Sequence, residues 1–325
     1  MGMRRFKIIT YKFLVNILLR LPDAFYAVLF AVVFPIYKAL HKKRAYGRVE
    51  KHLAAAKEYA AKVYTKKMRT DSSTKSALLN VTPRDTFRGI FWNALESYRG
   101  LARFKSIEKR IVYENEHIIR EAIAVCAKQN APIAGISIHQ GAFELMHRAL
   151  CRYSEHVHLI TDSVGDIAFR DVLKELRSDP HLTEYHPDET GRLIRELFRT
   201  KGILAMVVDQ GKHTKGNFVS LFGRPSTLYL RLPQKINEMG AGIVIFRTWS
   251  EKKRIVIRFE NYYPPKYDEN AGKAANAAPS ENPQNLDKSP LVTAIASEIE
   301  TWIADHPEQW SWNYHGNFVQ SKAQS

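Results

Sequence analysis

The sequence predicts an α/β protein in which helices flank a largely parallel or mixed central sheet, with a membrane-associated helix at the N-terminus. The main observation is the alternation between residues 133 and 208, where short apolar runs typical of buried strands are separated by stretches of helical length. The second is that 45% of the 325 residues are hydrophobic, enough for a sizeable core. The third is an apolar segment close to the N-terminus.

This N-terminal segment comprises two apolar runs, residues 13–20 and 24–37, with basic residues on both sides. The uninterrupted run is shorter than the ~20 residues that cross a bilayer, and Arg20, Asp23 and Pro35 interrupt or bound it. We therefore expect an interfacial helix or a tilted anchor, with an ordinary core helix as the alternative. A cleaved signal peptide is not expected, because no small-residue cleavage site follows the run.

Helices are expected next over residues 47–69, which are charged and rich in alanine, and from Pro83 to about Phe104. Thr82 precedes the second of these helices as a suitable cap, and proline is favoured at the first helical position. The elements expected after them are a helix at 112–128, a strand at 133–138, a helix at 142–154, a strand at 157–161, helices at 166–177 and 190–200, and a strand at 203–208.

The remaining third of the chain has a different pattern. Residues Phe218–Pro225 predict a strand and a tight turn, residues 227–239 a helix, and residues 242–249 with 254–260 a hairpin. Residues 264–289 are rich in Pro, Asn, Ala, Lys and Ser, which is typical of a mobile surface insertion. A final amphipathic helix is expected at 290–305.

The net charge of +16 indicates a polyanionic partner, which is nucleic acid, anionic lipid or an acidic protein. No nucleic-acid-binding motif accompanies the charge, so nucleic acid is not expected. Cys126 and Cys151 have no CxxC neighbour, which favours buried thiols in a reducing compartment. Scattered histidines lack a third ligand at metal-binding spacing, and no nucleotide-binding glycine motif is found, so neither a metal nor a nucleotide cofactor is expected.

The chemistry is expected where the strand at 133–138 ends at His139. Gly141 permits a bend, and Glu144 then falls in the first turn of the next helix. A histidine and a carboxylate brought together at a strand end form a general base and its orienting partner, although a structural hydrogen-bonded pair is the alternative. Asp209 and Gln210 follow the strand at 203–208 and reach the same edge of a parallel sheet, where they shape the pocket or cap the next turn.

Five segments together resemble the bacterial lipid A biosynthesis acyltransferase family, of the lauroyl and myristoyl transferase type. They are GISIHQGAFE at 135–144, VVDQ at 207–210, VSLFGRPST at 219–227, GAGIVIF at 240–246 and HPEQWSW at 306–312. A single HxxxxE motif is common by chance, but five segments in the family's order are specific. The resemblance extends from about residue 15 to 318.

The resemblance implies a glycerolipid-acyltransferase-like fold, with residues 1–46 as the membrane-associated segment and 47–325 as the acyltransferase catalytic domain. It implies an O-acyltransferase at the cytoplasmic face of the cell inner membrane, which moves a fatty acyl chain from an acyl carrier protein or coenzyme A thioester to a hydroxyl of a lipid A precursor or related glycolipid. No cofactor is implied beyond this co-substrate. The expected partners are the membrane, the glycolipid and the donor, and a monomer is expected.

In this reading His139 removes the proton from the acceptor hydroxyl, and Glu144 holds the imidazole and stabilises its charged form. Backbone amides near Gly141 would bind the oxyanion. Arg177 stands about where the family keeps an arginine that could assist, and Arg170 is the alternative.

Arg224, in the turn Phe222–Pro225, is a candidate to face a phosphate, although such a sequence is more often only a turn. Trp310 and Trp312 are interpreted as packing residues or interfacial anchors.

Two departures from the family pattern leave the acceptor open. Ala142-Phe143 stands where the family has Asn-Trp, and the tail Asn313-Tyr-His315-Gly-Asn-Phe318 replaces a basic His-Arg-Arg run. The alternatives are a divergent member that acts on another glycolipid, a catalytically inactive membrane-bound scaffold of the same fold, and a basic nucleic-acid-binding protein.

Overall fold

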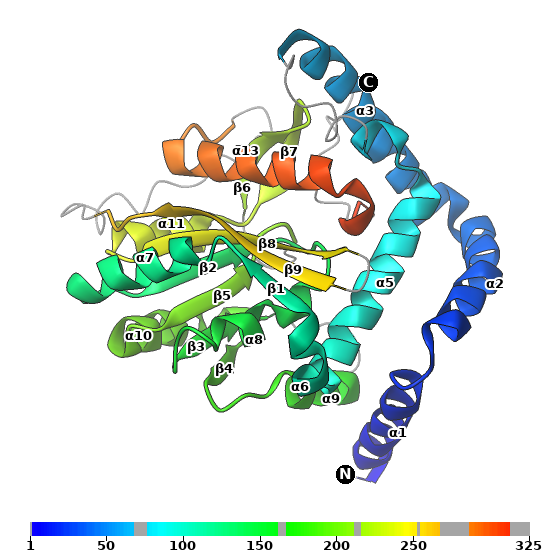
Figure 1. Ribbon diagram of the computed structural model, residues 1–325, viewed down its shortest axis with the longest axis horizontal. Helices are drawn as coiled ribbons and strands as arrows, with labels where there is room; N and C mark the ends of the chain where they lie inside the picture. The colour runs from blue at the N-terminus through cyan, green and yellow to red at the C-terminus, as the bar shows by residue number, and fades with distance from the viewer. Residues whose placement is uncertain are drawn as a thin grey trace.

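A seven-stranded mixed sheet with helices on both faces forms the centre of the protein (Figure 1). This arrangement is seen in a computed structural model that describes residues 2–67, 77–161, 167–210, 216–251, 254–266 and 286–312. The expected fold class is confirmed. The insertion expected at 264–289 lies mostly outside the described residues.

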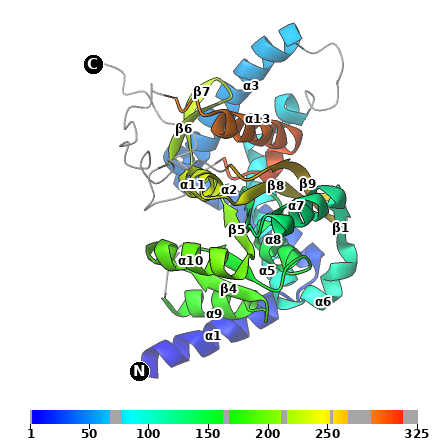
Figure 2. The same cartoon turned by 90° about the vertical axis from the view of Figure 1, so that its left-hand side faces the viewer.

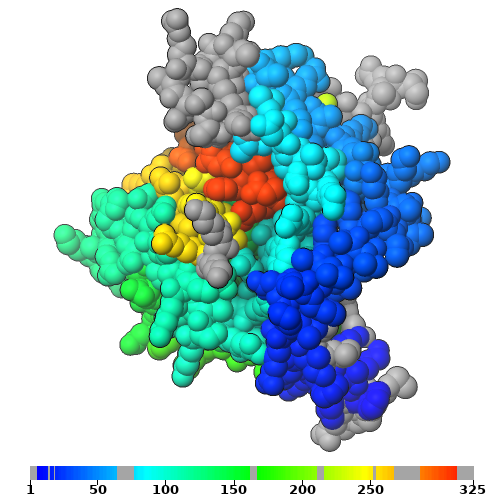
Figure 3. Space-filling view, turned by 45° about the vertical axis from the view of Figure 1, so that its right-hand side comes forward, coloured from blue at the N-terminus to red at the C-terminus, as the bar shows by residue number. Residues whose placement is uncertain are grey.

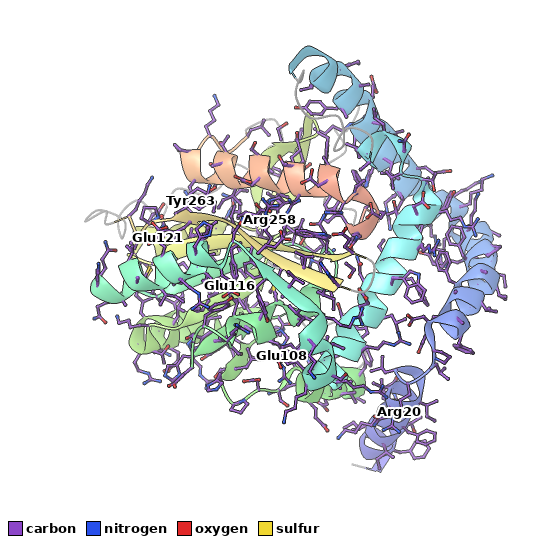
Figure 4. The ribbon with its side chains drawn as sticks, in the orientation of Figure 1. Arg20, Glu108, Glu116, Glu121, Arg258 and Tyr263 are labelled. Carbon is purple, nitrogen blue, oxygen red and sulfur yellow. The ribbon has the colours of Figure 1, made fainter. Side chains whose placement is uncertain are left out.

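The strand order in this sheet is β1-β9-β8-β2-β5-β3-β4. Neighbouring strands are parallel except β8 and β9, which form an antiparallel hairpin. Figure 4 shows Arg258 on β9, whose guanidinium lies 3.8 Å from the carboxylate of Glu114 on β1. The strands are β1 (Ile111–Glu114), β2 (Ile133–Ser137), β3 (Val157–Ile160), β4 (Leu182–Tyr185), β5 (Ile203–Val207), β8 (Gly242–Glu251) and β9 (Arg254–Tyr263), with β6 (Asn217–Leu221) and β7 (Arg224–Leu228) in a separate antiparallel pair.

The helices follow the expected positions closely in the N-terminal third. Thr82 caps the start of α5, as the sequence predicts, and forms a reciprocal capping box with Asp85. The α-helices are α1 (Gly2–Leu18), α2 (Asp23–His41), α3 (Gly47–Lys67), α5 (Pro83–Ala102), α6 (Phe104–Ile107), α7 (Glu116–Lys128), α8 (Met146–Leu150), α9 (Ile167–Arg177), α10 (Thr190–Thr200), α11 (Arg231–Glu238) and α13 (Pro290–Asp305). The shorter helices are the π-helix η1 (Lys42–Tyr46) and the 3₁₀-helices η2 (Glu108–Arg110), η3 (Phe143–Leu145), η4 (Pro187–Glu189) and η5 (Pro307–Gln309).

Four local predictions were wrong or incomplete. The start of the expected helix at 112–128 is strand β1, which forms by pairing with β9, and the start of the expected helix at 227–239 belongs to strand β7. Strand β4 was missed, and the helix expected at 142–154 is reduced to η3 and α8. The partners of β1 and β4 lie in other parts of the chain, so local periodicity could not reveal these two strands, whereas β7 pairs with the adjacent strand β6 across a tight turn.

Each face of the sheet has its own hydrophobic core. Successive side chains of a strand point to opposite faces, so Ala134 and Ile136 of β2 lie in one core and Ile133 lies in the other. One core includes residues of α10, α11 and α13, and the other includes residues of α7 and α8. Figure 2 shows α10 and α11 on one side of the sheet and α7 and α8 on the other. These two layers fix the ends of β2 and β5, where the site lies.

Helices α1 and α2 lie outside α5, at the margin of the molecule (Figure 3). One face of α2 packs against α5, where Tyr26 and Phe34 are buried against Trp92 and Phe87. The opposite faces expose large apolar side chains at helical spacing. These are Phe6, Ile9, Phe13 and Ile17 of α1, and Phe25, Val28, Val32, Val33, Ile36 and Leu40 of α2.

One segment in the described residues, Asp23–Val63, is long and apolar enough to cross a membrane as judged from length and composition. Its apolar part is mostly exposed. Figure 4 shows Arg20 at the break between α1 and α2, directly before this segment.

Candidate active site

His139 and Asp209 lie side by side at one edge of the sheet. Strands β2 and β5 are parallel, and Ser137 pairs with Val207, so the residues two positions further along each strand leave the sheet together. The Oδ1 atom of Asp209 accepts a hydrogen bond from the backbone N–H of His139 at 3.0 Å and contacts Nδ1 of its ring at 2.8 Å. The sheet thus joins two segments that are 70 residues apart in the sequence.

The protonation of this pair follows from the burial of Asp209, whose side chain is 1% exposed. Burial raises the pKa of Asp209, but the charge of His139 and hydrogen bonds from His139 and Trp310 outweigh it and leave the pKa below its usual range. An ionised carboxylate only accepts hydrogen bonds, so Nδ1 of His139 carries the proton. The other ring nitrogen, Nε2, is therefore left as the acceptor that a general base needs.

The imidazole remains accessible. The His139 side chain is 20% exposed, and its ring lies 4.5 Å from the ring of Phe143. An oriented, accessible imidazole with a buried carboxylate behind it can remove a proton from a bound hydroxyl.

The second oxygen of Asp209 is bound by a residue from the C-terminal part of the chain. Oδ2 accepts a hydrogen bond of 2.9 Å from the indole N–H of Trp310. Trp310 follows η5 directly, is completely buried, and forms an isolated antiparallel bridge with Gln140 in the His139 loop. The sequence interpretation of Trp310 as a packing residue or an interfacial anchor missed this contact, because no local pattern relates residue 310 to residue 209.

The expected direct contact between His139 and Glu144 is wrong in this structure. Glu144 does occupy the first turn of the helix after His139, in η3, but both carboxylate oxygens bind Arg177. Nε of Arg177 lies 2.8 Å from Oε2, and Nη2 lies 2.7 Å from Oε1. Arg177 is the last residue of α9, and its guanidinium offers the forked geometry that a carboxylate accepts best. The orienting partner of His139 is instead Asp209.

Glu144 nevertheless lies within the electrostatic reach of His139. Burial raises the pKa of Glu144, but the charge of Arg177 and its hydrogen bonds outweigh this effect, with smaller contributions from His147 and His139. The net pKa is below the usual range, so Glu144 is ionised at neutral pH. The site therefore contains two buried carboxylates, one bound to the imidazole and one neutralised by Arg177.

Gly141 is required by two features of the loop. Its φ angle is +57°, and an added Cβ would lie 2.6 Å from both the carbonyl oxygen of Thr248 and the Cα of Trp249. Its N–H donates to the carbonyl oxygen of Gln309 at 3.2 Å. The N–H of Gly141 itself therefore already has an acceptor, and the binding of an oxyanion by backbone amides near Gly141 stays a prediction.

The other predicted residues fall in different places. Gln210 is half-buried beside Asp209, and Arg170 is exposed on α9, while Arg177 at the end of the same helix reaches Glu144. Arg224 is exposed at the start of β7, where its charge acts on His52 and Glu58 of α3. The structure thus brings His139, Asp209, Glu144 and Arg177 together and leaves Arg224 elsewhere.

In the described parts of the chain, no group of three or more His, Cys, Asp or Glu side chains is placed to hold a metal ion. Neither thiol is activated. Burial raises the pKa of Cys126, and burial together with Asp179 raises the pKa of Cys151 to about 12.

Comparison with known proteins gives one family match. The model of the family described as bacterial lipid A biosynthesis acyltransferase matches residues 90–315, which is more than half of the chain. The comparison with curated proteins gave no match.

Proposed function

The chain belongs to the bacterial lipid A biosynthesis acyltransferase family, and on this premise we propose that it transfers a fatty acyl chain from an acyl thioester to a hydroxyl of a lipid A precursor or related glycolipid. Membership supports acyltransferase activity in general terms. The observation that carries the proposal is the hydrogen bond between the accessible imidazole of His139 and the buried carboxylate of Asp209.

In the proposed reaction Nε2 of His139 takes the proton of the acceptor hydroxyl while the hydroxyl oxygen attacks the thioester carbonyl carbon. The carbon–sulfur bond then breaks, and the leaving thiolate takes the proton from the imidazolium. Asp209 stabilises the imidazolium through the bond to Nδ1. A direct transfer is favoured over an acyl-enzyme because burial keeps both thiols protonated.

Glu144 and Arg177 keep a proposed role beside the base. Glu144 adds negative charge near the imidazolium without contacting it, and the contact with Arg177 keeps this carboxylate ionised although it is buried. Arg177 is proposed to assist the oxyanion in preference to Arg170, because Arg177 binds Glu144 whereas Arg170 is exposed.

The donor is proposed to be the thioester of acyl carrier protein or of coenzyme A. Both donors are anionic, and the net charge of +16 favours either. The attraction would weaken with salt in both cases, so charge supports the class of donor rather than one member.

The exposed apolar faces of α1 and α2 support attachment to the cytoplasmic face of the cell inner membrane. Because Tyr26 and Phe34 of α2 are buried against α5, lipid can cover only the outer face of this helix. We therefore propose that α1 and α2 lie along the membrane interface, with Lys38, Lys42 and Lys43 near anionic headgroups.

The test is an acyl-transfer assay on detergent-solubilised protein, with labelled acyl-carrier-protein and acyl-CoA thioesters and a total lipid extract containing lipid A precursors. An acylated glycolipid formed by the wild-type protein and reduced on the order of 100-fold or more in His139→Ala is expected. The donor that gives product identifies the co-substrate. Equal product from His139→Ala at an unchanged melting temperature would contradict the role of His139, and the absence of product from all combinations would favour the inactive scaffold.

A further inference from the structure

We infer that Trp310 is a positioning residue of the active site, whose indole N–H holds the carboxylate of Asp209 in the plane in which it bonds to His139. This inference rests on the proposed role of His139 as the general base. It gives a function in the reaction to the segment at 306–312, which lies more than 90 residues beyond Asp209 in the sequence.

The hydrogen bonds of Asp209 show why a second donor matters. Its Oδ1 atom receives both the backbone N–H and Nδ1 of His139, while the partner of Oδ2 among the described residues is Nε1 of Trp310. A carboxylate held at one oxygen can turn about its bond to Cβ, whereas donors at both oxygens fix its plane. The carboxylate is almost completely buried, so solvent cannot easily replace the indole.

Trp310 is itself held firmly against the loop that carries His139. It forms a backbone bridge with Gln140, and the preceding residue, Gln309, accepts the N–H of Gly141. The side chain of Gln140 donates to the carbonyl oxygen of Trp302 at 2.9 Å, which ties the same loop to α13. The C-terminal segment therefore holds both the histidine loop and the carboxylate, and it sets their relative position.

Trp312 provides a matched control within the same aromatic cluster. The two indole rings lie 4.9 Å apart, and both side chains are completely buried. The N–H of Trp312 also has an acceptor, the carbonyl oxygen of Pro307 at 2.6 Å, but this bond does not lead to the site. Replacing either indole by phenylalanine removes one buried N–H donor, and only one of the two changes reaches Asp209.

The experiment compares the kinetics of Trp310→Phe and Trp312→Phe. For Trp310→Phe we expect kcat to fall about 10-fold with KM nearly unchanged, as for an interaction that matters in the transition state. The indole N–H is one of the contacts that lower the pKa of Asp209, so its loss leaves a more basic carboxylate that stabilises the imidazolium more strongly, and the acidic limb of the rate profile should move to higher pH. Trp312→Phe should lower the melting temperature but leave kcat and the pH profile unchanged.

Two further measurements separate positioning from packing. Trp310→Phe should cause no further loss of kcat in an Asp209→Asn background, because residues that act as one unit are not additive. Replacing Trp310 by 3-benzothienylalanine keeps the two-ring shape and removes the N–H, so it should reproduce the effect of Trp310→Phe even if the phenylalanine variant folds poorly. Equal losses of kcat in Trp310→Phe and Trp312→Phe, or full activity of the benzothienyl variant, would overturn the inference.

A measurement without substrate distinguishes this inference from the proposed function. The Nδ1–H proton of His139, assigned by its absence in His139→Ala, should give a downfield proton NMR signal because it is bonded to a carboxylate. Trp310→Phe should shift or broaden this signal, and Trp312→Phe should not. A shifted signal in a protein with no transferase activity would support the positioning role while the proposed function fails, and an unchanged signal would overturn the positioning role.

Discussion

At the residue scale, the two buried carboxylates of the site have different partners and should respond differently to the loss of charge. Asp209 is bound to an accessible imidazole, so in the proposed reaction the charge of Asp209 matters most when His139 becomes protonated. Glu144 is bound to Arg177, which is itself largely buried. The charge of Glu144 therefore contributes to the stability of the folded protein before any substrate reacts. Amide substitutions preserve the shape of each side chain and test the charge alone.

We expect Asp209→Asn to lower kcat on the order of 100-fold or more, with a smaller effect on unfolding. Glu144→Gln should instead lower the free energy of unfolding by about 3–5 kcal/mol, because Arg177 is left buried without its counter-charge. Steady-state kinetics and denaturant unfolding of both variants measure the contrast. Equal kinetic losses at equal stability would contradict the separate roles.

Gly141 offers a second test at this scale. Gly141→Ala places a side chain at a φ of +57° and 2.6 Å from backbone atoms of Thr248 and Trp249, which cannot move as a flexible side chain can. We expect a loss of more than about 2 kcal/mol of unfolding free energy together with a loss of activity. Gly191→Ala on α10 is the control, since no atom lies within 4 Å of an added Cβ there. It should be neutral or stabilising by up to about 1 kcal/mol, and equal losses would contradict the steric explanation.

At the scale of elements, buried histidines couple the packing of the sheet to pH. His158 of β3 is 4% exposed, with Nδ1 3.3 Å from the hydroxyl of Tyr185 on β4 and Nε2 2.9 Å from that of Thr200 on α10. Burial lowers the pKa of His158 from 6.5 to about 4. The folded protein thus keeps this side chain neutral over a pH range in which the unfolded chain binds a proton.

The sign of the effect follows from linkage. A histidine whose pKa is lowered on folding contributes full stability above about pH 6.5, and this contribution is lost as the pH falls towards about 4. We expect the free energy of unfolding to fall by up to about 1.4 kcal/mol per pH unit for this residue within that window. His158→Gln should flatten the slope, and His117→Gln, at an exposed position on α7, should not. Denaturant unfolding between pH 4 and 7 measures both, and an unchanged slope in His158→Gln would contradict the assignment.

A helix or strand is predicted correctly when neighbouring residues in the sequence encode it, and is missed when a distant strand defines it. The cap Thr82, the apolar run of β2 and the hairpin of β8 and β9 are encoded locally, and the sequence predicts them correctly. Strand β1 is four residues long and forms in parallel with β9, more than 140 residues away. Its residues have no distinctive period of their own, so only the paired partner defines them as a strand.

At the scale of the whole molecule, the two N-terminal helices both expose an apolar surface. Their exposed apolar side chains recur at intervals of three or four residues, and the opposite faces are occupied by the rest of the protein. Such a surface is suited to the boundary between headgroups and acyl chains of a bilayer.

We expect the double variant Val28→Glu and Val32→Glu to bind anionic lipid vesicles at least about 10-fold more weakly, because two apolar side chains that would enter the bilayer are lost and two charges are added. Both valines are highly exposed, at 65% and 60%, so the folded structure should be retained. Met239→Glu, at an exposed apolar position away from these helices, is the control. Vesicle flotation measures binding, and equal flotation of the double variant and the wild type would contradict the interfacial arrangement.

The sequence by itself determined the fold class, the apolar character of the N-terminal segment, the family and the position of His139 at the end of β2. These properties depend on local periodicity, on composition and on the order of short motifs, all of which are present in the linear chain. Only the tertiary structure decided the partners of the site residues. The parallel pairing of β2 with β5 places Asp209 beside His139. The end of α9 places Arg177 against Glu144, and the segment that follows η5 places Trp310 against Asp209. Each of these contacts joins residues at least 33 positions apart, and hydrogen bonds at that separation are set by how elements pack rather than by sequence spacing.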